Sequence, residues 1–259
     1  MLTFDAGIFA DALDDVARLE ALLESNDGWL DVPDHRTYFK DKFIKLGKEL
    51  DHLGLKVSKY KAQQIHVAFE SADPFMDGLA KRNTVQRSCQ SLRESLLVEL
   101  SGRKFYGPLP GYEKYYDQVQ LFGADVFQSF GSATEDIFEA GMCLSLERGT
   151  ACVMHLMRVL EAGLLALANA VGVTNKNDWG SYLKLIEAEL DKRLKAAGAR
   201  SPDEQFYSEA ATNFDRVRRA FRNPTMHVGA SYSLERAGEI LLATKSFMAH
   251  LATRLSENS

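Results

Sequence analysis

The segment TACVMHLMRVLEAGLLALANAV, residues Thr150–Val171, decides the fold class of this chain. Apolar or small side chains cover almost all of its helical surface, and the interruptions are His155, Arg158, Glu161 and Asn169. A helix that is apolar on nearly every side needs cover on every side, so it lies at the centre of its fold. The segment therefore predicts a central helix.

The rest of the chain shows apolar residues three and four apart, while the alternation typical of strands is nearly absent. We predict an all-α protein, with an N-terminal helical bundle or array followed by a second helical bundle. The last helix has a long apolar face that suits either packing within the bundle or a dimer interface. The predicted helices span about 5–23, 36–53, 58–69, 77–100, 122–130, 134–146, 150–171, 179–196, 202–221 and 233–255. Ser58 and Asp178 are the predicted N-caps of two of them.

The run GPLPG at 107–111 breaks the helical pattern and marks the predicted domain boundary. We expect an N-terminal helical domain of unknown role at 1–115 and a second helical domain at 116–259. Aromatic residues crowd this break. They either anchor the loop on a bundle or form a surface on which nucleotide bases stack. These aromatic residues are Phe105, Tyr106, Tyr112, Tyr115 and Tyr116.

The overall composition argues against several classes of protein. The formal net charge of −5 and the pI of about 5.7 disfavour a protein that coats nucleic acid nonspecifically, because that mode needs many phosphate contacts. No uninterrupted apolar run approaches the ~18 residues of a membrane span, and acidic residues stand near the N-terminus where a secretory signal has basic ones. We expect a soluble, cytoplasmic protein with no membrane partner.

Cysteine and histidine spacings predict no metal site and no cofactor. The three cysteines, Cys89, Cys143 and Cys152, fit neither a disulfide framework nor a paired-ligand zinc site, so we expect buried thiols. The six histidines include no pair four residues apart and no HExxH motif. A phosphate-binding glycine loop is also absent from the sequence.

The stretch RNPTMH at 222–227 concentrates potential chemistry. A guanidinium such as that of Arg222 holds a phosphate through two hydrogen bonds, and an imidazole such as that of His227 transfers protons near neutral pH. These are the minimum needs of metal-free phosphodiester transesterification, in which a base takes the ribose 2′-OH proton and a cation stabilises the phosphoryl oxygens. Alternatively, Arg222 has no role beyond its position in the last turn of a helix, where a cation interacts favourably with the helix dipole. Pro224 then starts a turn and His227 is an exposed loop residue.

Two further sets of polar residues accompany this motif. His155, Arg158 and Glu161 step by three and fall on one stripe of the central helix. Either the charged pair Arg158 and Glu161 forms a buried ion pair, or the helix carries these polar groups to a shared site. The helix before the motif has a basic face that we predict to bind RNA, formed by Arg216, Arg218 and Arg219.

The motif and its setting resemble the HEPN superfamily. The likeness lies in a helix that ends in Arg222-Asn223, four residues between the arginine and His227, and a further helix after them. The upstream segments HLMRVLEAGLLALANAVGV and DWGSYLKLIEAEL are similar to the earlier helices of HEPN domains of uncharacterised bacterial proteins. The resemblance covers about residues 122–255.

The resemblance implies a homodimer in which two motifs meet, cleave RNA without a metal and leave a 2′,3′-cyclic phosphate. It implies His227 as the proton-transfer group, Arg222 as the phosphate contact and Asn223 as a polar assistant, with Glu161 or Arg158 in support. Many HEPN ribonucleases are toxins or phage-defence effectors, so an antitoxin or regulatory protein is an expected partner beside RNA. The alternatives are a noncatalytic module that binds RNA, a nucleotide or a protein, and an interaction scaffold with no nucleic-acid role.

Overall fold

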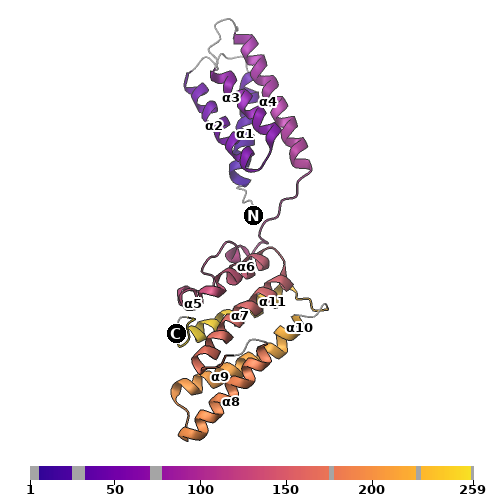
Figure 1. The fold of residues 1–259 in the computed structure, drawn as a ribbon. Helices are drawn as coiled ribbons and strands as arrows, with labels where there is room; N and C mark the ends of the chain where they lie inside the picture. Colours follow the sequence, from indigo (N-terminus) through magenta and orange to yellow (C-terminus); the bar gives the residue numbers. More distant parts are fainter. Residues whose placement is uncertain (1–5, 25–32, 71–77, 175–177, 226–228, 258–259) are drawn as a thin grey trace. The chain divides into compact units, whose positions relative to one another are not determined.

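The computed structural model describes residues 6–24, 33–70, 78–174, 178–225 and 229–257. Helices make up most of these residues, and no strand occurs among them, which confirms the prediction of an all-α protein. The chain divides into two compact units, Met1–Phe105 and Tyr106–Ser259. Figure 1 shows the helices of each unit.

The first unit is a bundle of α1 (Ala6–Glu24), α2 (Pro33–His52), α3 (Lys56–Glu70) and α4 (Gly78–Ser101). Each helix packs against its neighbour in the sequence, and α1 also contacts α4, which closes the bundle (Figure 1). One apolar face of each helix supplies the core, as three-and-four spacing predicts. The largest fully buried side chains of this unit are Leu19, Leu50, Leu55, Ile65 and Leu92.

The predicted N-cap of α3 is wrong. The helix begins at Lys56, before Ser58, and Ser58 is fully buried. Its backbone N–H donates to Glu99 on α4 at 2.8 Å and its hydroxyl donates to the same oxygen at 2.6 Å, while the N–H of Val57 donates at 3.2 Å. A carboxylate from another helix therefore satisfies the free N–H groups at the start of α3.

The two units separate between Phe105 and Tyr106, ten residues before the predicted boundary. Tyr112 and Tyr115 pack against the core of the second unit, and the N–H of Leu109 donates to the carbonyl of Ser145 at 2.9 Å. The chain therefore belongs to the second unit before the GPLPG run begins. These tyrosines anchor the connecting loop, whereas 78% of Tyr106 is exposed.

The second unit is built around α7 (Gly149–Val171), which contacts α6 (Thr134–Ser145), α8 (Trp179–Ala197), α9 (Pro202–Val217) and α11 (Leu234–Ala252). This arrangement confirms that the apolar helix is central, as Figure 1 shows. Gly172 ends α7 in a left-handed conformation, and Asp178 caps α8 by accepting from Ser181, as predicted. The shorter elements are η2 (Glu113–Tyr115), α5 (Ala124–Ser129), η3 (Gly131–Ala133), η4 (Arg218–Arg222) and α10 (Asn223–Thr225).

Within the described residues, α7 is the one helix long and apolar enough to cross a membrane. Its most apolar stretch is 67% buried inside the unit, which is the behaviour of a core helix. This burial is consistent with a soluble protein. A search for unbroken apolar runs does not find this helix, because His155, Arg158 and Glu161 interrupt its apolar sequence.

The apolar face of α11 is covered within the second unit. A Cβ on Gly163 of α7 would lie 2.9 Å from Leu251 and 3.1 Å from Met248, so glycine lets the two helices approach closely. Because most of this face lies in the core, its buried residues are not free to form a dimer interface. The α11 residues buried there are Ala237, Ile240, Leu241, Met248 and Leu251.

Candidate functional site

The candidate site begins at the C-terminal end of α9. Ser201 and Glu204 form a reciprocal capping box at the start of this helix, and Pro202 occupies its first turn. Phe206, Ala210, Ala211 and Phe214 bury one face. The opposite side is left to polar and charged residues, which continue into η4.

The helix widens at η4, where Arg218–Arg222 form a π-helical turn. The N–H of Asn223 donates to the carbonyl of Arg218, five residues earlier. Pro224 gives the physical reason, because proline has no N–H and its ring clashes with the carbonyl four residues before it. The wider turn relieves that clash, so the helix continues through Pro224 as α10 rather than turning there.

Such π-turns are rare and occur frequently at functional sites. Here the wide turn ends at Arg222, and Asn223 follows it as the first residue of α10. The Arg222 side chain is half-buried and Asn223 is exposed. Both predicted groups therefore lie at an accessible helix end.

The segment after this turn is anchored to the start of α7. Thr225 is buried, its hydroxyl donates to the carbonyl of Phe221 at 2.6 Å, and the hydroxyl of Tyr232 lies 2.8 Å from it. The N–H of Tyr232 donates to Thr150 on α7 at 3.0 Å. His227 lies outside the described residues, and in the sequence it falls between the two anchors Thr225 and Tyr232.

The arginines of this helix end differ in their partners. Arg218 donates to one oxygen of Asp215 at 2.8 Å, and Arg219 pairs with the other at 2.7 Å. The hydrogen bond from Arg218 holds the pKa of Asp215 below its usual value, with Arg219 adding to the effect, although burial opposes both. Among the described residues, Arg216 and Arg222 form no ion pair, so their guanidinium groups remain available to an anion.

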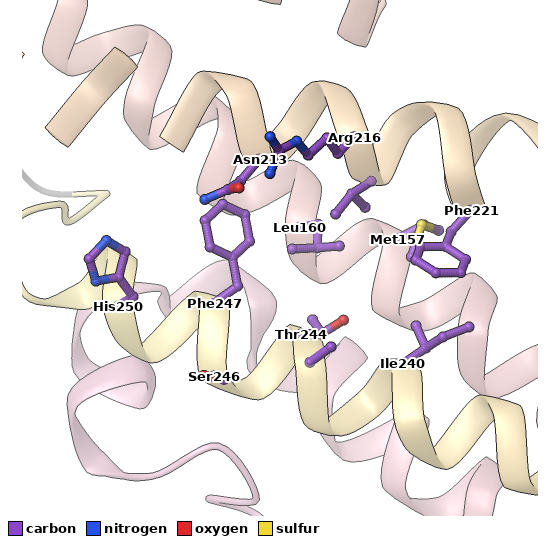
Figure 2. Close-up of a pocket in the computed structure, with 12 residues that line it drawn as sticks. Met157, Leu160, Asn213, Arg216, Phe221, Ile240, Thr244, Ser246, Phe247 and His250 are labelled. Carbon is purple, nitrogen blue, oxygen red and sulfur yellow. The ribbon is translucent and has the colours of Figure 1, made fainter. Parts of the chain in front are cut away.

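A groove of about 480 Å³ runs between α9 and α11 next to these arginines. Figure 2 shows Asn213 and Arg216 projecting from α9 on one side, with Thr244 and Phe247 on α11 opposite. Phe221 lies at one end of the groove and also carries the guanidinium of Arg236 over its ring, 5.3 Å from the centroid. The other lining residues are Met157, Leu160, Val217, Ile240, Ala243, Ser246 and His250.

The polar stripe on α7 does not contain a buried ion pair between Arg158 and Glu161, which is one of its two interpretations. Arg158 pairs with Asp136 on α6 at 2.8 Å rather than with Glu161, and its side chain is 70% exposed. The hydrogen bond to Asp136 raises the pKa of Arg158. His155 donates from Nδ1 to the same carboxylate at 2.8 Å when that nitrogen is protonated. Glu161 is exposed.

Three features of the site escaped the sequence interpretation. Neither Asp215 nor Asp136 belongs to the predicted site, although Asp215 stands three and four residues before the arginines it binds. Asp136 is 19 residues from His155, so no local spacing indicates their pairing. The groove arises from the packing of α9 against α11, which the sequence does not specify.

Comparison of the chain with protein-family models, with curated proteins and with solved structures finds no match. The HEPN resemblance therefore stays a prediction from the sequence.

Proposed function

We propose that the second unit is a metal-independent endoribonuclease of the HEPN type. One observation carries this proposal: Arg222 lies on a π-turn and has no ion-pair partner among the described residues, and it stands five residues before His227 in the sequence. Arg218 and Arg219 are both held by Asp215, which leaves Arg216 and Arg222 as the proposed phosphate contacts.

In the proposed reaction, His227 takes the proton from the ribose 2′-OH and the 2′-oxygen attacks the adjacent phosphorus. The bond from phosphorus to the 5′-oxygen of the next nucleotide breaks, and that oxygen gains a proton. The products are a 2′,3′-cyclic phosphate and a 5′-hydroxyl. Arg222 stabilises the charge that builds on the phosphoryl oxygens, and Asn223 assists as a hydrogen-bond donor.

The groove beside α9 supports RNA as the substrate. Its aromatic side chains, Phe221 and Phe247, present surfaces on which a base stacks, and Asn213 and Thr244 offer hydrogen-bond partners for the base edge. Its volume of about 480 Å³ is within the range of small-ligand pockets. A base in the groove would place its phosphate near Arg216, which lines the same groove.

The wider proposals rest on the family resemblance alone. They are a cytoplasmic toxin or phage-defence effector, an antitoxin or regulatory partner, and a homodimer that joins two motifs. Since the apolar face of α11 is buried within its own unit, such a dimer would use another surface.

Cleavage of a mixed-sequence RNA in excess chelator tests the proposed reaction. We expect the whole protein to cleave the RNA, and substitution of the 2′-hydroxyl by hydrogen to prevent cleavage. Arg222→Ala should lower the rate about 100- to 1000-fold through lost charge stabilisation. His227→Ala should lower it about 100- to 10,000-fold through lost proton transfer.

Arg219→Ala is the matched control, because Arg219 lies on the same turn but is held by Asp215. Its rate should stay within about threefold of the wild type, an ordinary effect for an exposed ion pair. Intact RNA at high protein concentration, or equal cleavage by His227→Ala, would reject the ribonuclease.

The groove also favours a second function, a noncatalytic module that binds RNA or a nucleotide. In that case Arg216→Ala and Phe247→Ala should weaken binding of a single-stranded RNA, while no variant or condition yields cleaved product. Absence of binding even at low salt would instead indicate an interaction scaffold, because phosphate contacts strengthen as salt falls.

A further inference from the structure

We propose that Glu139, Cys143 and His155 form a binding site for a divalent transition-metal ion, with zinc as the best match. Glu139 and Cys143 are four residues apart on α6, so they share one face of that helix. His155 comes from α7, which packs against α6. The carboxylate oxygen, the thiol sulfur and the ring nitrogen of these three residues all lie within 4.8 Å of one another.

Asp136 provides the second, independent observation. It lies one turn before Glu139 on α6, only 9% of it is exposed, and it holds Nδ1 of His155 at 2.8 Å. Engagement of Nδ1 leaves Nε2 with the free lone pair that a metal requires. Metal-ligating histidines nearly always donate their other nitrogen to a carboxylate or carbonyl in this way. Arg158 fixes Asp136 in turn, with its Nε 2.9 Å from the second carboxylate oxygen.

The donor set indicates which metal the site would take. Thiolate sulfur, imidazole nitrogen and one carboxylate oxygen suit Zn²⁺ and its spectroscopic substitute Co²⁺, whereas Mg²⁺ and Ca²⁺ prefer oxygen alone. Around a tetrahedral ion with ordinary bond lengths, such donors lie roughly 3.3–3.7 Å apart. Donors within 4.8 Å need only side-chain adjustments to reach that geometry.

The site is accessible and incomplete, as a metal site with an open position should be. Glu139, Cys143 and His155 are all half-buried, and the His155 side chain is 30% exposed. Three protein ligands leave the fourth position of a tetrahedral ion for water or an incoming group.

A thiolate nucleophile is the less suitable role for Cys143. Burial raises the pKa of this thiol, and the negative charge of Glu139 raises it further, while Arg148 opposes them. Reactive cysteines instead have a lowered pKa in electropositive surroundings. A cation between the sulfur and the carboxylate would stabilise both negative charges.

Cobalt titration of the chelator-treated full-length protein tests this site. We expect one Co²⁺ per chain, visible bands of tetrahedral cobalt and a near-ultraviolet sulfur-to-cobalt charge-transfer band, all displaced by Zn²⁺. Cys143→Ser should remove the charge-transfer band, and His155→Ala should abolish tight binding. Asp136→Asn should keep the ligands but weaken binding about 10- to 100-fold, as loss of a supporting carboxylate does.

Cys89→Ala is the matched control, because Cys89 is a cysteine of the first unit. It should keep both the stoichiometry and the charge-transfer band, and circular dichroism should show that each variant is folded. A charge-transfer band that persists in Cys143→Ser, or a protein that binds no Co²⁺ at millimolar concentration, would overturn the metal site.

The metal site and the ribonuclease can fail separately. Arg222→Ala should keep the cobalt spectrum, since Arg222 does not belong to the cluster. Loss of RNA cleavage in that variant therefore reports only on the phosphate contact.

Discussion

In the first unit each of the four helices covers part of one core and leaves its other side to solvent, whereas in the second unit α6, α8, α9 and α11 pack around α7 and leave one stripe of it exposed. Each unit also contains a carboxylate that joins two helices. Glu99 of the first unit accepts from the start of α3, while Asp136 of the second accepts from two side chains of α7. The comparison shows that similar bridging carboxylates serve different ends: Glu99 completes a helix, and Asp136 orients a histidine.

The same substitution in the two units should have effects of opposite sign. A Cβ on Gly163 would approach Leu251 and Met248 to 2.9 and 3.1 Å, whereas a Cβ on Gly47 of α2 would meet nothing within 4 Å. Gly163→Ala should therefore destabilise the second unit by about 1–2 kcal/mol through overpacking. Gly47→Ala should stabilise the first by about 0.5–1 kcal/mol, because glycine is unfavourable inside a helix.

Buried thiols can report on each unit separately. Alkylation of Cys89 in urea follows opening of the first unit, and alkylation of Cys152 follows opening of the second. Gly163→Ala should accelerate labelling of Cys152 alone, and Gly47→Ala should slow labelling of Cys89 alone. Equal shifts at both thiols would show that the units open together.

Loss of the Glu99 carboxylate should have a smaller effect, confined to the first unit. Burial would raise the pKa of Glu99, but the hydrogen bonds from Ser58 and Val57, with the charge of Arg103, hold it below its usual value. Glu99→Gln should cost about 1 kcal/mol at pH 7. Urea unfolding followed by circular dichroism measures the difference.

The pH dependence follows from the lowered pKa of Glu99. The contribution of the ionised Glu99 carboxylate to the free energy of unfolding is complete above the unfolded-state pKa of about 4.3. It is lost as the pH falls through the lower folded-state pKa. The wild type and Glu99→Gln should therefore converge in stability in strong acid. Glu94→Gln, an exposed change on the same helix, should differ little from the wild type at any pH. A wild-type advantage that grows as the pH falls would contradict the assignment.

The smallest expected effect concerns the arginines of the second unit. Asp215→Asn removes the carboxylate that holds Arg218 and Arg219, so RNA should bind a few-fold more tightly. The salt dependence of binding should steepen by about 0.7 in log–log slope for each new phosphate contact. Fluorescence anisotropy over a range of KCl concentrations measures both. Asp203→Asn is the control, because Asp203 pairs with Arg254 near the start of the same helix.

The sequence was sufficient for the features that depend on neighbouring residues. The apolar run of α7, the left-handed stop at Gly172 and the cap at Asp178 each follow from local spacing and residue type, and the structure confirms them. Ser58 has the residue type and position of an N-cap, but the acceptor at the start of α3 is Glu99, 41 residues away.

The sequence was insufficient where two helices must meet. Glu161 is one turn from Arg158, so local spacing favours it as the ion-pair partner, but the packing of α6 on α7 makes Asp136 the partner. The cluster of Glu139, Cys143 and His155 has the same origin, so no single-helix metal motif contains it. Pro224 predicts an interruption of the helix, but the structure accommodates it with a π-turn. Helix propensities of single residues do not predict such a turn, because it depends on how the backbone relieves the clash with the proline ring.

The central position of α7 also has a consequence for biosynthesis. Synthesis on the ribosome delivers α7 well before α11, which begins 63 residues after α7 ends and covers one of its faces. At ~5–20 residues per second, the most apolar helix of the chain waits on the order of ten seconds for that cover. The first unit has no comparable delay, because its helices pack against their neighbours in the sequence. Nascent chains that stall before Leu234 would therefore expose a strongly adhesive segment and depend on chaperones to stay in solution.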